Sequence, residues 1–159
     1  VARFHNIFGP MGTYKGGREK APAAMCRKAI EAIENGTFEI EVWGDGKQTR
    51  SFLYIDECIE GIIRLMNCEN FNGPVNIGSD EMVPINYLAK LAIDFTEKEI
   101  KINNVDVQQI GVRGRNSDNN LIMEKLSWKP EEKLRDGLLK TFDWIKDQMR
   151  PSTSGSPNH

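Results

Sequence analysis

Three short basic segments hold the residues most able to do chemistry in this 159-residue chain. The first contains Lys15, Arg18 and Lys20 in a glycine-rich loop, and Lys28 follows in a segment with helical periodicity. Such a loop can bring cations and backbone amides onto a phosphate group. A lysine in a partly desolvated site can also lose its proton and act as a general acid or base. From composition alone, a solvated basic loop without function remains the simpler alternative.

Two further basic segments carry arginines next to small or polar residues. Gln48, Thr49 and Arg50 follow a Gly-Asp-Gly turn, and Arg113 lies between glycines in the segment 111–118. The rigid, permanently charged guanidinium group suits phosphate, and glycines let the backbone approach a ligand closely. Taken singly, an exposed turn and a polar loop explain these segments equally well. Three basic segments at intervals fit a polyanionic small molecule such as a nucleoside diphosphate sugar.

Composition and charge argue against several other functions. A net charge of −2 gives no support to nucleic-acid binding. Cys26, Cys58 and Cys68 match no metal-ligand spacing, and only His5 and His159 are histidines, so we expect no metal site. The cysteine count favours reduced thiols in a cytoplasmic protein. No apolar run of about 18 residues occurs, so we expect no membrane span.

The glycines at positions 9 and 12 follow a predicted strand, but they do not form a dinucleotide-binding turn. Such a turn needs a helix that begins at once, so that its N-terminus faces the pyrophosphate. Pro10 and the loop after it delay any helix until Pro22, and no GxGxxG motif occurs in the chain. The sequence therefore contains no recognisable site for a dinucleotide.

Short strands and helices alternate along the chain and must position these segments, which predicts the α/β fold class. Strand patterns occur over 1–8, 38–43, 48–55, 74–78 and 101–105. Helical periodicity and end signals predict helices over 22–35, 57–67, 84–96, 120–126 and 133–150. The Ser/Pro/Gly-rich tail (151–159) is predicted to be disordered.

Several local predictions concern packing. Phe38, Ile40 and Val42 should share one strand face, and the turn at 44–47 should return the chain as a hairpin partner of that strand. Asp56 should cap the following helix. That helix should bury an apolar stripe: Ile59, Ile62, Ile63 and Met66. Cys26 is interpreted as a packing residue, and the tryptophans (Trp43, Trp128 and Trp144) as core or lid residues.

The chain opens with Val1 inside a predicted strand. A natural chain seldom begins in the middle of an element. We therefore expect a fragment of a longer protein or a truncated gene model.

Ordered strings of residues are more specific than composition. They are residues 3–10 (RFHNIFGP), 43–57 (WGDGKQTRSFLYIDE), 75–78 (VNIG) and 126–130 (LSWKP). In this order they resemble the C-terminal half of the extended short-chain dehydrogenase/reductase family of nucleotide-sugar enzymes. The strings at 12–24 (GTYKGGREKAPAA) and 111–119 (GVRGRNSDN) are most similar to members that epimerise GDP-mannose at C3 and C5. The resemblance covers about residues 1–149.

The resemblance implies a fold, a cofactor and an activity. Residues 1–150 would be the substrate-binding half of an extended Rossmann-type fold, with an incomplete sheet and the last strands and helices of a truncated NAD(P)-binding domain. Bound NAD would oxidise the sugar at C4, an acid/base pair would exchange the C3 and C5 protons, and NADH would reduce C4 again. GDP-D-mannose would become GDP-L-galactose. The parent would be a cytoplasmic homodimer that serves L-ascorbate biosynthesis.

The resemblance also implies roles for single residues. Lys20 would be one partner of the catalytic acid/base pair, with Glu19 and Ala21 beside it at the sugar. Asn6 would contact the substrate next to the nicotinamide, and Lys28 would contact phosphate or ribose. The remaining implied substrate contacts are Gln48, Thr49 and Arg50 on a nucleotide-contacting strand and Arg113 at the pyrophosphate.

The chain departs from the family in three features. The Gly-rich turn and the Tyr-x-x-x-Lys pair are absent, and no cysteine matches the acid/base partner of Lys20. We therefore expect NAD to bind mainly to a missing N-terminal half, and the chain alone to be inactive. Another nucleotide-sugar epimerase or 4,6-dehydratase of the same family, and a non-catalytic sugar-nucleotide-binding protein, remain alternatives.

Overall fold

The computed structural model describes residues 1–106 and 113–150. The segment 107–112, within the predicted polar loop, and the tail predicted to be disordered (151–159) lie outside the described residues. The described part is mixed α/β, as predicted. Its five helices are α1 (Ala21–Glu34), α2 (Ile55–Met66), α3 (Ile85–Asp94), α4 (Asn120–Leu126) and α5 (Leu134–Met149). Each agrees with a predicted helix: α4 has the predicted bounds, and the other four differ only at the ends.

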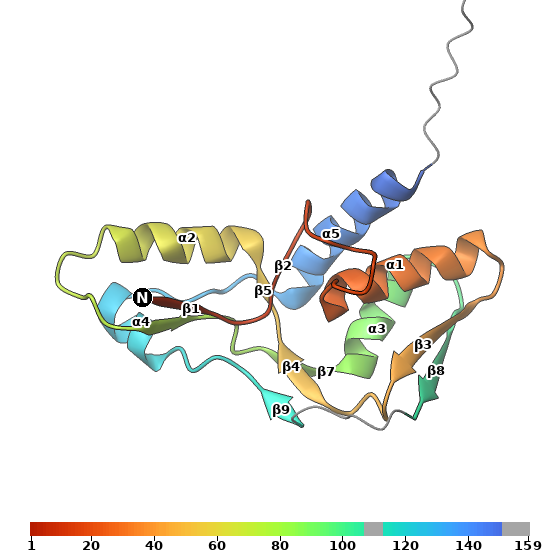
Figure 1. Ribbon diagram of the computed structural model, residues 1–159, viewed down its shortest axis with the longest axis horizontal. Helices are drawn as coiled ribbons and strands as arrows, with labels where there is room; N and C mark the ends of the chain where they lie inside the picture. Colours follow the sequence, from red (N-terminus) through yellow and green to blue (C-terminus); the bar gives the residue numbers. More distant parts are fainter. Residues whose placement is uncertain (107–112, 151–159) are drawn as a thin grey trace, which may run out of the picture.

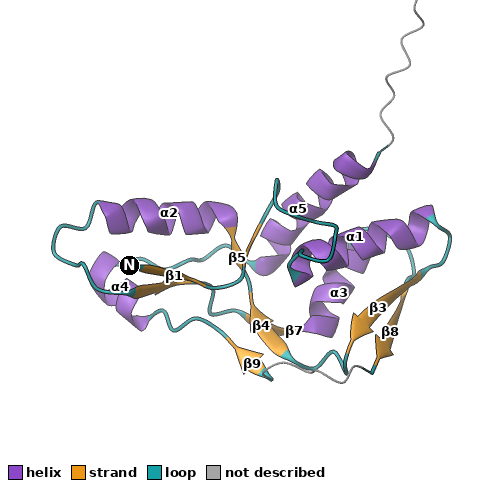
Figure 2. Cartoon of the chain, in the orientation of Figure 1, coloured by secondary structure: helices purple, strands orange, loops and turns teal. Residues whose placement is uncertain are grey.

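Short strands form four small sheets in the described residues (Figure 2). Three sheets are parallel pairs: β1 (Ala2–Phe4) with β6 (Val75–Ile77), β2 (Ile7–Phe8) with β5 (Leu53–Tyr54), and β3 (Glu39–Trp43) with β8 (Lys101–Val105). In the fourth, β4 (Thr49–Ser51) lies between antiparallel β7 (Met82–Pro84) and parallel β9 (Gly114–Arg115).

The elements gather around two apolar clusters (Figure 1). The smaller cluster lies between α2, α4 and the β1–β6 pair, where Ile77 and Ile122 are fully buried. The larger cluster lies among α1, α3, α5 and the β3–β8 pair, with Leu88 and Leu138 fully buried. Because Ile55 packs against both clusters, the start of α2 joins them.

Helix α1 follows the basic loop directly and packs against the larger cluster, so it fixes the position of the end of the loop. Pro22 lies in its first turn, where a missing N–H costs nothing. Small buried residues such as Ala29 and Ala32 let α3 and α5 approach closely, and Cys26 is fully buried among them, in line with the predicted packing role. Gly36 follows the C-terminus with a φ of 67° and ends the helix.

The predicted hairpin is wrong. Strand β3 does not pair with the strand after the turn; it pairs in parallel with β8, with Glu39 opposite Lys101. The returning strand β4 pairs with β7 and β9 instead. The glycines at 44 and 46 do adopt positive φ, so the turn exists, but it carries the chain into a different sheet.

The predicted start and buried face of the second helix are also corrected. The N-cap is Tyr54, and Asp56 lies inside the first turn of α2, where its charge still favours the positive end of the helix dipole. Ile59, Ile63 and Met66 are 47%, 49% and 79% exposed rather than buried. The apolar stripe exists, but within the described part only Ile62 of the four packs against a cluster.

Two aromatic residues near β3 are more exposed than predicted. Ile40 and Val42 are buried as expected, but Phe38 adopts a φ of 47° just before the strand and is 46% exposed. Trp43 is 65% exposed, so it is not a core residue. Trp128 and Trp144 are partly buried against the two clusters, which agrees with the prediction.

Candidate functional site

One pocket gathers most of the residues to which the sequence analysis gave roles in substrate binding. It has a volume of about 490 Å³ and lies where the start of α1, the end of β3 and strand β4 meet the link between β1 and β2. Seven of the predicted residues line it: Asn6, Glu19, Lys20, Ala21, Lys28, Gln48 and Arg50. They come from three segments far apart in the sequence.

Asn6 enters the pocket from the link between β1 and β2. Its φ of 45° is in the left-handed region, which asparagine tolerates better than most residues. The side-chain Nδ2 donates to the Ser51 carbonyl at 3.0 Å, and the Asn6 carbonyl accepts from Leu53 N at 3.1 Å. These contacts fix the amide, and its Oδ1 atom remains as the polar group that it can offer to a ligand.

Glu19 lies at the end of the glycine-rich loop with only 9% of its side chain exposed. Its Oε1 atom pairs with Arg27 Nη2 at 3.0 Å, whereas Oε2 is buried without a partner among the described residues. The pKa of this carboxyl is lowered because its own backbone N–H donates to it. Arg27 adds a hydrogen bond and a positive charge, against burial, which raises the pKa. The pocket wall therefore contains a carboxylate whose buried Oε2 atom lacks a side-chain or backbone partner among the described residues.

Lys20 and Ala21 form the junction between this loop and α1. Lys20 is the N-cap residue, with an extended backbone (φ −75°, ψ 156°), and its carbonyl accepts from Ala24 N at 3.0 Å. Its ammonium group has no hydrogen-bond or ion-pair partner within the described part of the chain. A lysine held by its backbone at a helix start, with an uncommitted side chain, is suited to move a proton at a ligand in the pocket.

Lys28 and Gln48 approach the pocket from opposite elements. Lys28 Nζ donates to the Glu41 carbonyl at 2.7 Å. Burial, and then the like charge of Arg27, lower the pKa of Lys28. Gln48 Nε2 donates to the Trp43 carbonyl at 3.1 Å, while its Oε1 atom is buried without a partner in the described residues.

Two acceptors in one pocket, Glu19 Oε2 and Gln48 Oε1, thus lack donors within the described part. Buried polar atoms without partners cost free energy, and hydroxyl or N–H groups of a ligand, or water, would satisfy them. Lys20, Lys28 and Arg50 line the same pocket and bring positive charge to it. The arrangement suits a ligand that has both hydroxyl groups and negative charge.

Thr49 and Arg113 are not brought to the pocket. Side chains alternate along a strand, so Gln48 and Arg50 face the pocket and Thr49 faces the other way. Thr49 N donates to the Arg113 carbonyl at 2.8 Å, which places these two residues side by side where β4 meets β9.

Among the pocket residues that the sequence analysis did not assign to the substrate, Arg27 and Trp43 have the largest polar or aromatic side chains to offer. Arg27 looked like one more charged residue of an amphipathic helix, and only its i,i+4 spacing to Glu31 hinted at an ion pair. Trp43 was predicted to be a core or lid residue; it is exposed and lines the pocket, which excludes the core and leaves the lid alternative open. Neither signal was strong enough to place these side chains at the site.

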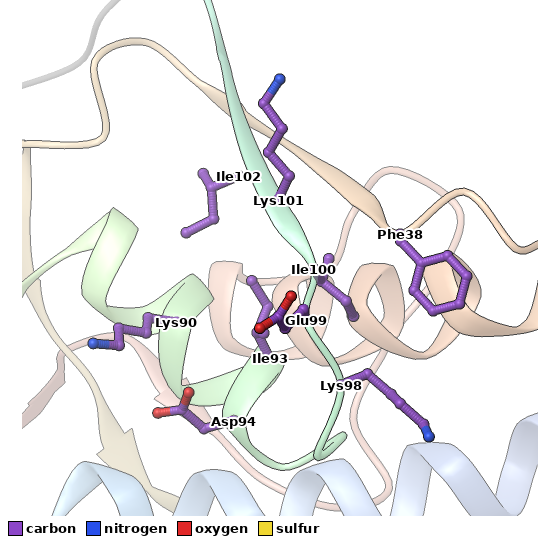
Figure 3. A pocket seen from close by; sticks show the side chains of 9 residues that line it. All are labelled: Phe38, Lys90, Ile93, Asp94, Lys98, Glu99, Ile100, Lys101 and Ile102. Carbon is purple, nitrogen blue, oxygen red and sulfur yellow. The ribbon is translucent and has the colours of Figure 1, made fainter.

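A second hollow, of about 570 Å³, lies where α3 ends and β8 begins (Figure 3). None of the predicted site residues lines it. Figure 3 shows that the side chains of Lys90, Lys98 and Lys101 point in different directions, so their charges do not converge on one ligand. The apolar Ile93, Ile100 and Ile102 lie between them. This hollow is therefore a weaker candidate for a ligand-binding site than the first.

The described ranges show neither a membrane-spanning helix nor a metal-ligating cluster. No helix there has the length and apolar character that a membrane crossing requires. The same ranges contain no group of three or more potential metal-ligating His, Cys, Asp or Glu side chains.

The described residues do not fit a dinucleotide. Gly9 packs against the side chain of Ile55, and a Cβ there would overlap it, so this glycine serves helix–strand packing. No helix follows until Ala21, so no helix N-terminus stands over the glycines to face a pyrophosphate. The Gly-rich loop between β2 and α1 is therefore too long to act as the tight dinucleotide-binding turn between a strand and a helix.

Residues 1–78 match the NAD dependent epimerase/dehydratase family. Together with the relatives below, this match shows that the chain belongs to that family. It is 56% identical over 149 residues to GDP-mannose 3,5-epimerase of Arabidopsis thaliana and 57% identical to GDP-mannose 3,5-epimerase 1 of Oryza sativa subsp. indica. Each alignment covers 94% of this chain, which spans 38% of the length of these curated relatives.

Solved structures support the fold. UDP-glucose 4-epimerase of Thermotoga maritima superposes with a TM-score of 0.83 over 94% of this chain and 46% of its own, at 24% identity. A likeness at this identity shows the fold alone, and it confirms the Rossmann-type class that the ordered strings implied.

Proposed function

We propose that this chain is the substrate-binding part of a GDP-mannose 3,5-epimerase. The observation that supports the proposal most directly is the pocket, in which seven implied substrate contacts come together from three segments. The name of the relatives, at 56–57% identity, supports the choice of GDP-mannose over other nucleotide sugars. The parent converts GDP-D-mannose to GDP-L-galactose.

In this proposal each pocket residue has a defined task. Lys28 and Arg50 bind the diphosphate and ribose, and Gln48 Oε1 accepts a hydrogen bond from the nucleotide. Asn6, Glu19 and Ala21 orient the sugar. Lys20 acts as one member of the acid/base pair that removes and returns protons at C3 and C5. Thr49 and Arg113 lie side by side where β4 meets β9, outside the pocket lining; there Thr49 contacts the nucleotide and Arg113 the pyrophosphate.

The family cofactor NAD supplies the transient oxidation at C4 that acidifies the neighbouring protons. The described residues form no site for it, so we assign its binding mainly to the remainder of the parent protein. We further propose a cytoplasmic homodimer that serves L-ascorbate biosynthesis and binds neither nucleic acid nor membrane. Without the redox half, residues 1–159 alone are inactive.

Exchange of carbon-bound hydrogen tests the proposal. The full-length protein that carries this sequence is incubated with GDP-mannose and NAD in deuterated water, and deuterium at C3 and C5 is measured by NMR. Incorporation at both carbons is expected, and none at either would refute the proposal.

Replacing Lys20 tests its part in the exchange. Lys20→Ala should abolish exchange while oxidation at C4 persists. Lys15→Ala is the matched control, because Lys15 belongs to the same loop but stacks on the Tyr14 ring and does not line the pocket. An equal loss of exchange in both variants would contradict the role of Lys20.

A further inference from the structure

Arg27 makes an unusual set of contacts for a residue on a helix surface. Its Nε donates to the Tyr14 carbonyl at 2.9 Å, its Nη2 to Glu19 Oε1 at 3.0 Å, and its Nη1 to Glu31 Oε2 at 2.6 Å. The guanidinium therefore bonds to both ends of the loop 14–19 and to its own helix at the same time. A planar group with separate donors is suited to this task, and an ammonium is not.

The loop between these contacts has little other support. Gly16 and Gly17 adopt φ values of 92° and 80°, with nothing packed within 4 Å of the position of a side chain. Tyr14 is held on its other side by an edge-to-face contact with Trp144, at 5.6 Å between ring centroids. Without Arg27, the described contacts would anchor the loop at Tyr14 but leave Glu19 without its side-chain partner.

We propose that Arg27 is a positioning residue: by binding Tyr14 and Glu19 together it fixes the Glu19 carboxylate in the pocket wall, where the unpaired Oε2 atom accepts a hydrogen bond from a hydroxyl group of the sugar. The inference rests on the proposed function for the identity of the sugar. Because Lys20 follows Glu19 directly in the chain, the contacts of Arg27 also fix the backbone position of the acid/base lysine. Glu31 holds the guanidinium from the helix side but does not touch the loop.

Four variants of the full-length protein test this role of Arg27. Arg27→Met removes all three donors, and Arg27→Lys keeps the charge but loses the fork. Glu31→Gln weakens only the helix-side contact, which is partly exposed. Arg64→Met is the matched arginine control, because Arg64 forms an i,i+4 pair with Glu60 on α2, outside the pocket.

The first measurement is amide hydrogen exchange of residues 14–20. Arg27→Met should speed exchange of this segment at least several-fold, Arg27→Lys should resemble it, and Glu31→Gln and Arg64→Met should resemble the wild type. Unchanged protection in Arg27→Met would overturn this role of Arg27. This readout needs no turnover, so it holds even if the protein shows no exchange at C3 or C5 and the proposed function fails.

The second measurement separates positioning from general damage. Arg27→Met should lower kcat for C3/C5 exchange by about 10- to 100-fold, as expected for a misplaced reacting group. The inhibition constant of GDP, which lacks the sugar, should stay unchanged. A rise in that constant equal to the fall in kcat would show that Arg27 merely supports the whole pocket. If the wild type proves inactive, affinities for GDP-mannose and GDP replace kcat, and only the former should weaken.

Discussion

Replacing Gly46 by alanine should lower the stability of the protein for two separable reasons. It lies in the turn before Gln48 with a φ of 67°, which costs an L-residue about 1–2 kcal/mol. A Cβ at this position would also overlap the amide group of Asn86, at the start of α3. That amide is held by bonds to Asn104 at 3.1–3.2 Å and by a weak one to the Asp45 carbonyl at 3.4 Å. Moving it gives up about 1 kcal/mol, because the bonds are exposed and fall at the low end of the usual range.

The two costs predict a specific pattern in a double-mutant cycle. Gly46→Ala should lower the free energy of unfolding by about 2–3 kcal/mol, and Asn86→Ala, which loses only the bonds, by about 1 kcal/mol. In the double variant the Asn86 side-chain hydrogen bonds are lost only once, and the new Cβ no longer overlaps an amide group. Its loss should therefore equal that of Gly46→Ala alone, which leaves a coupling of about 1 kcal/mol.

Urea denaturation of the four full-length proteins measures this coupling. Strict additivity, with the double variant losing about 3–4 kcal/mol, would refute the steric reasoning. A Gly46→Ala variant as stable as the wild type would refute both reasons. Because the turn leads into Gln48, Gly46→Ala should in addition weaken binding of GDP.

Two further predictions concern charge and thiol burial. Burial lowers the pKa of Lys28, so its protonated form carries a stability penalty at neutral pH that is relieved as the pH rises towards its ordinary value of 10.5. The melting temperature of Lys28→Met at pH 7 should therefore be no lower than that of the wild type, whereas its affinity for GDP should fall about 10-fold. A lower melting temperature with unchanged affinity would contradict this. Burial also raises the pKa of the Cys26 and Cys58 thiols, whereas Cys68 is half-buried. Iodoacetamide should alkylate Cys68 first in the native protein, as read by peptide mass spectrometry, and equal labelling of Cys26 would show that α1 opens readily.

Local features of this fold were predictable because their causes are local. Pro22 and Gly36 mark the ends of α1, and helical periodicity predicted the helix over 133–150. Its buried face contains Leu134, Leu138, Phe142 and Ile145, which recur at helical spacing. Strand partners were not predictable in the same way. The turn at 44–47 predicts a hairpin, but β3 finds its partner in β8, which begins only at Lys101. The choice between these partners depends on packing against α1 and α3, which no local pattern encodes.

The same distinction between local and distant causes applies to the candidate site. Composition indicated three basic segments and an anionic ligand, but it could not assign Asn6 or Glu19, which entered through the resemblance. Their environments depend on distant contacts: Asn6 on Ser51 and Leu53, and Glu19 on Arg27. Arg27 itself was missed because a bond from a helix back to a loop that precedes it leaves no periodic trace. Only the i,i+4 contact with Glu31 has a sequence signature.

The position of Asn6 suggests why the pocket lies where it does. Strand β1 belongs to the sheet with β6 beside the smaller cluster, and β2 carries Phe8 into the larger cluster. The chain passes from one to the other through His5 and Asn6, and the left-handed φ of Asn6 makes this change of direction. Bonds to Ser51 and Leu53 tie the link to β4 and β5. Arg50 of β4, and Gln48 just before it, also line the pocket. A ligand bound at Asn6 would therefore contact the link between the two clusters, and the strain there is held by the same strands that supply its nucleotide contacts.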